Sequence, residues 1–399
     1  MINMREDVMK NIMLKILVIL MNIIYLPIKL FKVKNKVTYM SRESNSETLD
    51  FKYIRERLEK DYPEYKNVVL TKKIEAKDGV IKQLLPNCIN IIKQMYHLAT
   101  SKVVIVDTYC IPVSVLSHKK QTKVIQIWHA LGAIKKFGYQ TINLKYGSDS
   151  NTAKIMKMHQ NYDYVFAPSN VTAKIYEQAF NVEESKIKYF GMPRVDFILE
   201  KNEKRKNLIY ETYPILKEKI NILYVPTYRK GEKLEIDELL EKIDTKKFNL
   251  IIKLHPLDIN EYKNKDKDGI IFETKFKTYD LLKIADKIIT DYSSLSIETS
   301  ILDIPIYFYT YDIEKYQKDN GLNFDFENEP IGKYNAQNVD KLLELLDQDY
   351  DYSALESFKN KYVSINKNDC TGQIVEFIVR LMRNEEVESI GNEHSKVLK

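Results

Sequence analysis

The sequence predicts an α/β protein built from two Rossmann-like halves. Short, continuously apolar, β-rich runs alternate with helix-like stretches along most of the 399 residues. This alternation is typical of parallel sheets covered by helices on both faces. A polar, charge-rich break at residues 200–207 divides the runs into two series. The length also favours more than one domain, because domains usually hold ~100–200 residues.

Composition excludes several classes of protein. Hydrophobic residues make up 44% of the chain, enough for a sizeable core, and 11 glycines with 11 prolines leave no room for collagen-like or low-complexity segments. Cys88, Cys110 and Cys370 show no CxxC spacing, so neither a disulfide scaffold nor a cysteine-rich zinc site is expected. Three scattered cysteines fit a protein of a reducing compartment. A net charge of +6 is too mild for a dedicated nucleic-acid binder.

The N-terminal segment, residues 1–35, is predicted to associate with a membrane. Ile12–Phe31 is apolar and just long enough to span a bilayer, but it is interrupted by polar or helix-breaking residues at Lys15, Asn22, Pro27 and Lys29. Lysines along and after it favour a helix lying in the interface against anionic lipid. A single span and a buried core helix are the alternatives. No small-residue cleavage site follows, so a cleaved signal peptide is not expected.

The first Rossmann-like half is expected at residues 36–204. Its strands are predicted at Val37–Met40, Asn67–Leu70, Lys102–Val106, Lys123–Ile127, Asp163–Phe166 and Ile187–Phe190. Helices are predicted between them at Phe51–Asp61 and Thr172–Phe180.

The second half is expected at residues 205–383, followed by a polar, frayed tail at 384–399. Its strands are predicted at Ile222–Val225, Asn249–Leu254, Gly269–Phe272, Lys287–Thr290 and Pro305–Tyr309. Helices are predicted at Ile236–Ile243, Tyr279–Ala285 and Ser294–Leu302. In folds of this kind the ligand binds at the carboxyl ends of the strands.

The first candidate site is the segment WHALGAIKKFG at residues 128–138, directly after a predicted strand. His129 is expected to project from the strand end, where a histidine can remove a proton from a hydroxyl near neutral pH. Gly132 and Gly138 allow close backbone approach, and Lys135 could meet an anion. The alternative is a hydrogen-bonded loop histidine with the lysines in solvent.

Two further candidates follow strands of the second half. The segment PTYR at residues 226–229 presents Arg229, whose planar guanidinium suits phosphate, with an exposed surface arginine as the alternative. The segment KLHP at residues 253–256 places His255 before a proline, which favours an extended backbone. His129 and His255 therefore occupy equivalent positions in the two halves.

The fourth candidate is the strand-to-helix junction in ITDYSSLSIET, residues 289–299. Asp291, Ser293 and Ser294 lie where free N–H groups and the helix dipole favour an anion, and the serine hydroxyls add donors for a diphosphate. An ordinary helix N-cap, stabilising by ~1 kcal/mol, is the alternative. No HExxH, GKS/T, GxGxxG or paired-aspartate metal pattern is present, so neither a metal nor a glycine-rich phosphate loop is expected.

Together, in this order, the four segments resemble the CDP-glycerol glycerophosphotransferase family of wall teichoic-acid primases and polymerases, over roughly residues 30–380. The resemblance implies a GT-B-like fold, with an acceptor-side domain and a CDP-donor domain facing across a cleft. It implies transfer of an alditol phosphate, glycerol phosphate first, from CDP-glycerol or CDP-ribitol to a lipid-linked acceptor hydroxyl, releasing CMP. It also implies peripheral attachment to the cytoplasmic face of the cell membrane, no required cofactor and no nucleic-acid partner.

The resemblance also implies roles for individual residues. His129 matches the histidine proposed as the base acting on the acceptor hydroxyl. Positions associated with the donor's phosphates are matched by Arg229, His255, Ser293 and Ser294. Asp291 matches the aspartate of that turn, with its role open. Further candidates are Lys135, Gly132, Thr227 and Asp312, the last with a structural role as the alternative.

Two positions depart from the family pattern. Ala130 stands where Trp-His-Gly is frequent, and Asn320-Gly321 stands where many members have Arg-Gly before an Asp-containing loop, here Phe324-Asp325. Two other functions also fit the residues: a GT-B glycosyltransferase that uses a nucleotide sugar, and a catalytically silent module that holds an anionic polymer or lipid. The sequence does not distinguish a primase from a polymerase, and it does not give the oligomeric state.

Overall fold

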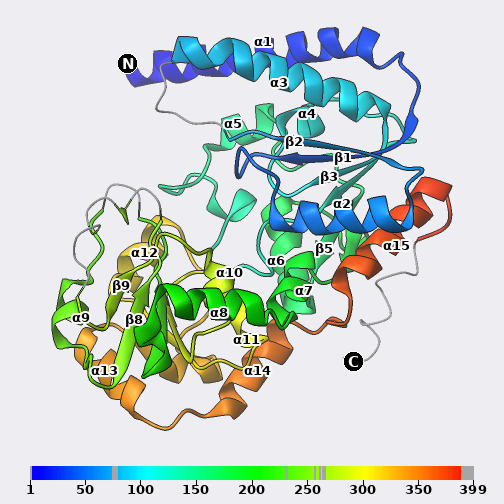
Figure 1. The fold of residues 1–399 in the computed structure, drawn as a ribbon. Helices are drawn as coiled ribbons and strands as arrows, with labels where there is room; N and C mark the ends of the chain where they lie inside the picture. Colours follow the sequence, from blue (N-terminus) through cyan, green and yellow to red (C-terminus); the bar gives the residue numbers. More distant parts are fainter. Residues whose placement is uncertain are drawn as a thin grey trace. The chain divides into compact units, whose positions relative to one another are not determined.

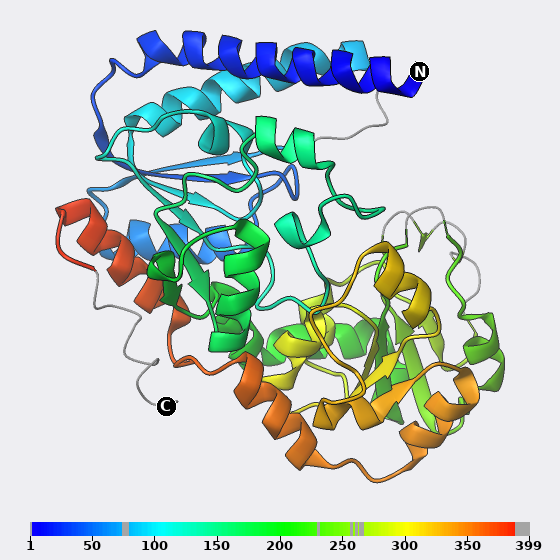
Figure 2. The ribbon, with the colours of Figure 1, turned by 180° about the vertical axis from the view of Figure 1, so that it is seen from behind.

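The computed structural model describes residues 2–73, 80–229, 232–255, 258–259, 262 and 267–387 (Figures 1 and 2). The chain forms two compact units. The first comprises residues 1–131, 136–196 and 364–399, and the second comprises residues 132–135 and 197–363. Each unit is built on one six-stranded parallel sheet. The predicted α/β class with two Rossmann-like domains is therefore confirmed.

The first sheet has the spatial order β2-β1-β3-β4-β5-β6. Its strands are β1 (Lys34–Ser41), β2 (Lys66–Thr71), β3 (Ser101–Val106), β4 (Lys123–Gln126), β5 (Tyr164–Ala167) and β6 (Ile187–Tyr189). All six expected strands are present, with ends that differ by at most three residues from the expectation. The pairing runs Val103↔Lys123 and Val37↔Val103, so the carboxyl ends of β1, β3 and β4 lie side by side.

The second sheet has the spatial order β12-β11-β10-β7-β8-β9. Its strands are β7 (Ile220–Val225), β8 (Phe248–Ile252), β9 (Ile270–Phe272), β10 (Lys287–Thr290), β11 (Ile306–Tyr309) and the two-residue β12 (Asn335–Ala336). The expected strands are again present, and β12 was not anticipated because two residues carry no periodic pattern.

Helices flank both sheets (Figure 1). In the first unit they are α1 (Ile2–Ile28), α2 (Leu49–Asp61), α3 (Val80–Thr100), α4 (Ile111–Val115), α5 (Ser150–Ile155), α6 (Asn170–Phe180) and α15 (Cys370–Arg383), with α7 (Pro193–Leu199) at the boundary. In the second unit they are α8 (Glu203–Thr212), α9 (Asp237–Lys242), α10 (Thr278–Leu281), α11 (Leu295–Ser300), α12 (Ile313–Asp319), α13 (Val339–Asp347) and α14 (Tyr352–Tyr362). Within the described residues, short 3₁₀ turns lie at Gly138–Thr141, Glu184–Lys186, Pro214–Lys217 and Pro330–Tyr334.

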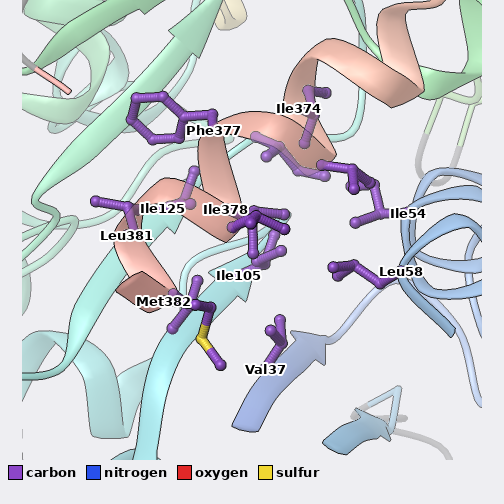
Figure 3. Close-up of a cluster of buried hydrophobic side chains, with 14 of the residues drawn as sticks. Val37, Ile54, Leu58, Ile105, Ile125, Ile374, Phe377, Ile378, Leu381 and Met382 are labelled. Carbon is purple, nitrogen blue, oxygen red and sulfur yellow. The ribbon is translucent and has the colours of Figure 1, made fainter. Parts of the chain in front are cut away.

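The C-terminal helix α15 belongs to the first unit, whereas the sequence placed everything up to residue 383 in the second half. Its apolar stripe packs on the core that covers β1, β3 and β4 (Figure 3). Phe377 is fully buried, with its ring centroid 5.1 Å from Tyr164 and 5.3 Å from Phe190. An amphipathic helix pattern shows that one face is buried but not against which sheet, so the boundary could not be read from the sequence.

Two further boundaries differ from the expectation. Residues 197–204 lie with the second unit, and so does the segment Gly132–Lys135, although the sequence around it lies in the first. The predicted frayed tail at 384–399 includes Val387, which is only 3% exposed and packs on the first core. Residues 388–399 lie outside the described part of the chain.

Helix α1 is long and apolar enough over Asp7–Ile28 to cross a membrane. It runs beside α3 in both views (Figures 1 and 2). One face is attached to the first unit: Met21 and Tyr25 are buried, and the Lys10 ammonium lies 2.7 Å from Asp149 at the start of α5. Most of its remaining apolar side chains are exposed, among them Ile16 at 51% and Leu20 at 50%.

Candidate functional site

The second sheet has its topological switch point between β7 and β10. The chain passes from β7 to β8 and β9 on one side, then returns to β10 on the other side of β7. Ligands of open α/β sheets bind outside the carboxyl ends of the strands at such a point. The predicted residues Thr227, Arg229 and Asp291 follow β7 and β10, and Asp312 follows the next strand, β11.

Asp291 joins the ends of β7 and β10. Its carboxylate accepts the backbone N–H of Thr227 at 3.0 Å, the Thr227 hydroxyl at 2.6 Å and the N–H of Tyr292 at 2.6 Å. The side chain is 1% exposed. Asp291, whose role the sequence left open, thus connects two strand ends, and the Thr227 hydroxyl is engaged with it rather than directed at a ligand.

Arg229 lies between two carboxylates. Its Nη1 donates to Asp291 at 2.8 Å and to the Thr227 carbonyl at 2.9 Å, while Nε and Nη2 bind both oxygens of Asp312 at 2.6 and 2.8 Å. The rings of Tyr292 and Tyr311 cover it, at 5.5 and 4.7 Å from the guanidinium carbon. Burial alone would lower the pKa of the guanidinium, but Asp312 and Asp291 raise it overall, so Arg229 remains charged.

In this arrangement Arg229 binds protein carboxylates, whereas the sequence analysis expected it to face a ligand phosphate. Four of the five guanidinium donors bind protein oxygens, and the side chain is 3% exposed. Asp312 is likewise structural, since it also accepts the Tyr292 hydroxyl at 2.9 Å. Burial raises the pKa of Asp312, but the hydrogen bonds and charge of Arg229 outweigh it and lower the pKa overall.

Lys135 enters this edge from a segment that is distant in sequence. Its backbone pairs with Leu322 in an antiparallel bridge, and its carbonyl accepts the side-chain amide of Asn323 at 3.0 Å. The preceding carbonyl, that of Ile134, accepts the N–H of Asn323 at 2.8 Å. The loop at 320–326, where the sequence departs from the family pattern, therefore anchors the segment that carries Lys135. Gly132, the other candidate in this segment, is buried.

The ammonium of Lys135 lies in the electrostatic field of Arg229 and Asp291. Burial lowers the pKa of Lys135, the positive charge of Arg229 also lowers it, and the carboxylate of Asp291 raises it. Within the described residues the Lys135 Nζ makes no hydrogen bond, and the side chain is half-buried. A partly desolvated ammonium without a fixed partner is suited to binding an anionic ligand group.

The other two predicted segments of this unit lie at neighbouring strand ends. Ser293 and Ser294 are half-buried at the start of α11, where the Ser293 hydroxyl accepts the N–H of Leu295 at 3.3 Å and the Ser294 hydroxyl makes no capping bond. His255 follows β8 and stacks on Tyr228, with ring centroids 4.5 Å apart. Residue 256, the proline of that segment, lies outside the described residues.

In the first unit, His129 lies after β4, at the carboxyl edge of the sheet, as predicted. Its Nδ1 is 2.9 Å from the carbonyl oxygen of Asp107, which follows the neighbouring strand β3. Because a carbonyl oxygen only accepts, Nδ1 carries the proton, and Nε2 holds the lone pair of the neutral ring. The side chain is 34% exposed. This is the tautomer and the exposure that a general base requires.

The residue before it, Trp128, has a left-handed backbone with φ 58°. Such a conformation costs a bulky residue about 1–3 kcal/mol and persists only where the surroundings impose it. Here the Trp128 N–H donates to the Gln126 side-chain oxygen at 2.9 Å. The Trp128 ring stacks on Phe137, with ring centroids 4.4 Å apart, and lies tilted against the His129 ring, with centroids 3.9 Å apart. The strained turn thus fixes the orientation of the His129 ring. The other glycine of the segment, Gly138, is also left-handed at φ 57°, and a side chain there would meet the Ala179 carbonyl.

Sequence reasoning missed two carboxylates near His129. Asp107 ends the apolar run of β3, and Glu43 lies two residues beyond β1. Their position just after predicted strands was the signal that could have identified them, since β3 adjoins β4 in the sheet and β1 is the next strand beyond β3. Among the described residues, no cluster of three or more His, Cys, Asp or Glu side chains could hold a metal ion.

Comparison with known proteins identifies similar chains. A family model described as CDP-Glycerol:Poly(glycerophosphate) glycerophosphotransferase matches residues 23–380. The chain is 31% identical over 358 residues to the teichoic acid ribitol-phosphate primase of Bacillus spizizenii, covering 86% of this chain and 90% of that one. It is also 31% identical over 370 residues to the teichoic acid glycerol-phosphate primase of Bacillus subtilis, covering 88% and 93%.

Solved structures show the same fold. The wall teichoic acid polymerase TagF superimposes with a TM-score of 0.67 at 19% identity, covering 96% of this chain and 98% of that one. The UDP complex of S. aureus MnaA gives a TM-score of 0.57 at 12% identity, over 88% and 97%. The predicted GT-B-like fold class is confirmed by these similarities.

Replacing Asp291 by Asn should lower the free energy of unfolding by about 3–5 kcal/mol, because it leaves the buried charge of Arg229 with one carboxylate fewer. The measurement is urea unfolding followed by tryptophan fluorescence and circular dichroism. Asp237→Asn, which removes an exposed carboxylate 2.6 Å from Lys233, is the control and should cost at most about 1 kcal/mol. Equal losses in the two variants would contradict the structural role of Asp291.

Proposed function

Because the chain belongs to the CDP-glycerol:poly(glycerophosphate) glycerophosphotransferase family, we propose that it transfers an alditol phosphate from a CDP-alditol to a hydroxyl of a teichoic-acid-type, lipid-linked acceptor and releases CMP. Glycerol phosphate is the proposed group, following the family description. The observation that carries the proposal is that the family match extends over both units and includes all four segments at their sheets' carboxyl edges.

The proposed reaction is a direct displacement at the β-phosphorus of the donor. His129 Nε2 accepts the proton of the acceptor hydroxyl, the resulting oxygen forms a bond to phosphorus, and the bond to the CMP oxygen breaks. Positioning and electrostatic stabilisation carry most of the catalysis in phosphoryl transfer. The scheme itself uses no metal or cofactor.

The diphosphate of the donor is proposed to contact Lys135, His255 and the N–H and hydroxyl groups at Ser293–Ser294. The support is electrostatic: Arg229 with Asp291 and Asp312 carries one net negative charge, which by itself would repel a diphosphate. The ammonium of Lys135 offsets that charge. Arg229, Asp291, Asp312 and Thr227 then act indirectly, by holding the strand ends that carry the contacting groups.

Replacing His129 by Ala should reduce the rate of CMP release from CDP-glycerol by about 10²–10⁴-fold, the usual contribution of a positioned base. The dissociation constant for CDP-glycerol should stay within about threefold of the wild-type value, because the proposed donor contacts lie elsewhere. Turnover is measured by chromatography of the nucleotide products with a lipid-linked acceptor, and binding by calorimetry. His118→Ala, a histidine of the same unit bound to the Val113 carbonyl, is the control.

Three results would contradict the proposal. Normal turnover by His129→Ala would remove the assigned base. Release of a nucleoside diphosphate from a nucleotide sugar, with no CMP from either CDP-alditol, would favour a glycosyltransferase. Nucleotide binding without turnover across donors and acceptors would favour a catalytically silent module. Comparing CDP-glycerol with CDP-ribitol in the same assay identifies the donor.

We further propose that the protein acts at the cytoplasmic face of the membrane, with α1 lying in the interface. The support is the exposed apolar face of α1 together with the attachment of its other face to the first unit, through Met21, Tyr25 and Lys10. A spanning helix would lose those contacts. Lysines at 15, 29, 32 and 34 are placed to meet anionic headgroups.

Replacing both Ile16 and Leu20 by Glu should weaken cosedimentation with anionic phospholipid vesicles by at least about tenfold, because each inserted side chain contributes about 1.5–3 kcal/mol. Both side chains are exposed, so the fold should be preserved. Leu208→Glu, at a 44% exposed leucine of α8, is the control. Unchanged vesicle binding would contradict the interfacial role of α1, and wild-type protein that resists extraction at alkaline pH would indicate a span.

A further inference from the structure

Three strand ends carry titratable side chains at the carboxyl edge of the first sheet. Strands β1, β3 and β4 are neighbours, and they are followed by Glu43, Asp107 and His129. The topological switch of this sheet lies between β1 and β3, because the chain leaves β1 for β2 on one side and returns to β3 on the other. Glu43 and Asp107 therefore flank the position where an open α/β sheet binds its ligand.

Glu43 lies beside the proposed base. Its Oε1 is 3.9 Å from His129 Nδ1, with the two side chains 49% and 34% exposed. At this distance a carboxylate favours the protonated form of an imidazole, and the half-exposed setting weakens but does not abolish the effect.

The backbone around Glu43 is hydrogen-bonded to the residues that follow β3, where the carbonyl of Asp107 orients the His129 ring. The Glu43 N–H donates to the Ser41 hydroxyl at 3.1 Å, and the N–H of Arg42 donates to the Thr108 hydroxyl at 3.2 Å. The Arg42 guanidinium also donates to the carbonyl of Tyr109 at 3.2 Å. Because Asp107, the residue before Thr108, supplies the carbonyl that orients the His129 ring, Glu43 and the ring are held on one framework.

We propose that Glu43 is a positioning residue for His129 in the transfer reaction, where its carboxylate stabilises the imidazolium formed when Nε2 takes the acceptor proton. The inference rests on the proposed function. The proton moves from the acceptor hydroxyl to Nε2, while Nδ1 keeps its own proton and continues to donate it to the Asp107 carbonyl. The attacking oxygen is thereby left with the electron pair that forms the bond to phosphorus.

The other charged groups at this edge do not fill the same role. The carboxyl of Asp107 is 2% exposed, and burial raises its pKa to about 7, against the hydrogen bond from Ser41 and with a further rise from Glu43. Its carbonyl, not its carboxyl, contacts the ring. Asp50 is bound to Arg194 through Nε at 3.1 Å. Arg42 lies over the Tyr109 ring, 5.9 Å from its centroid.

A second histidine lies near His129 but carries no charge of its own at neutral pH. Burial lowers the pKa of His159 to about 3, with a smaller lowering from His129. Its Nδ1 pairs with the Tyr162 hydroxyl at 2.9 Å. Glu43 is therefore the accessible carboxylate that faces the His129 ring among the described residues.

The test compares Glu43→Gln, Glu43→Asp and the control Glu47→Gln in the full chain. Glu47 lies in the same loop, but it pairs with Arg55 at 2.7 Å rather than with His129. The readout is the titration midpoint of His129 by NMR of histidine Hε1, with the signal assigned from His129→Ala. Glu43→Gln should lower the midpoint by about half a pH unit, Glu43→Asp should lower it less, and Glu47→Gln should leave it unchanged.

Kinetics supply the second readout. Glu43→Gln should lower kcat about two- to fivefold at neutral pH without changing the KM for CDP-glycerol, and the acidic limb of its pH–rate profile should move to lower pH. The direction follows because the imidazolium is less stable without the carboxylate, so the base form persists to lower pH.

Two outcomes would overturn the inference. The first is that the His129 titration midpoint does not move in Glu43→Gln, or moves equally in Glu47→Gln. This outcome counts even if no CDP-alditol is turned over, because the NMR titration needs no activity. The second is that the midpoint shifts in Glu43→Gln but kcat and the pH–rate profile stay as in the wild type, since the charge of Glu43 would then be irrelevant to the reaction. Failure of the proposed function alone appears differently, as absence of CMP release by the wild-type protein.

Discussion

The buried guanidinium of Arg229 is the interaction on which the carboxyl edge of the second sheet depends. Asp291, after β10, and Asp312, after β11, both bind it, while its own residue follows β7. Three strand ends thus meet at one charge. A buried ion cluster of this kind contributes less to net stability than to the choice of a single arrangement, because desolvation offsets much of the attraction. We attribute to it the fixed geometry of the turns that carry the candidate ligand-binding groups.

That constraint has an electrostatic consequence. Two carboxylates around one guanidinium leave a net negative charge at an edge proposed to receive a diphosphate. In our proposal Lys135 compensates this net negative charge. Its segment is distant in sequence from the rest of the second unit and is held there by the bridge to Leu322 and the hydrogen bond from Asn323. Although Lys135 lies only six residues after His129 in the sequence, it belongs to the second unit.

The strands and the places where they end were predictable from the sequence, because continuous apolar runs that stop at polar residues mark buried parallel strands. The positions of His129, Arg229, His255 and Asp291 at carboxyl ends followed directly. Their partners did not. The binding of Arg229 by both Asp291 and Asp312 depends on strand order, because β10 becomes a neighbour of β7 only when the chain crosses, after β9, to the other side of β7.

The same reason explains the other differences. Helix α15 has an apolar stripe that could have covered either sheet, and only packing assigns it to the first unit. Glu43 is an exposed acidic residue in a loop, and the sequence does not distinguish it from Glu47. Only the strand order, in which β1 lies two strands from β4, shows that Glu43 lies near His129. Local pattern therefore identified which residues lie at an edge, and the order of strands decided which of them act together.

The central claim is that Lys135, and not Arg229, meets the donor's phosphates directly. Calorimetric titration of CDP-glycerol into Lys135→Ala and into Lys136→Ala tests it, since the two lysines are adjacent and only the first lies in the segment of the second unit. Loss of one charge-assisted contact, worth about 1.5–3 kcal/mol, predicts affinity about 10- to 100-fold lower for Lys135→Ala and near wild type for Lys136→Ala. Equal affinities in the two variants would contradict the claim.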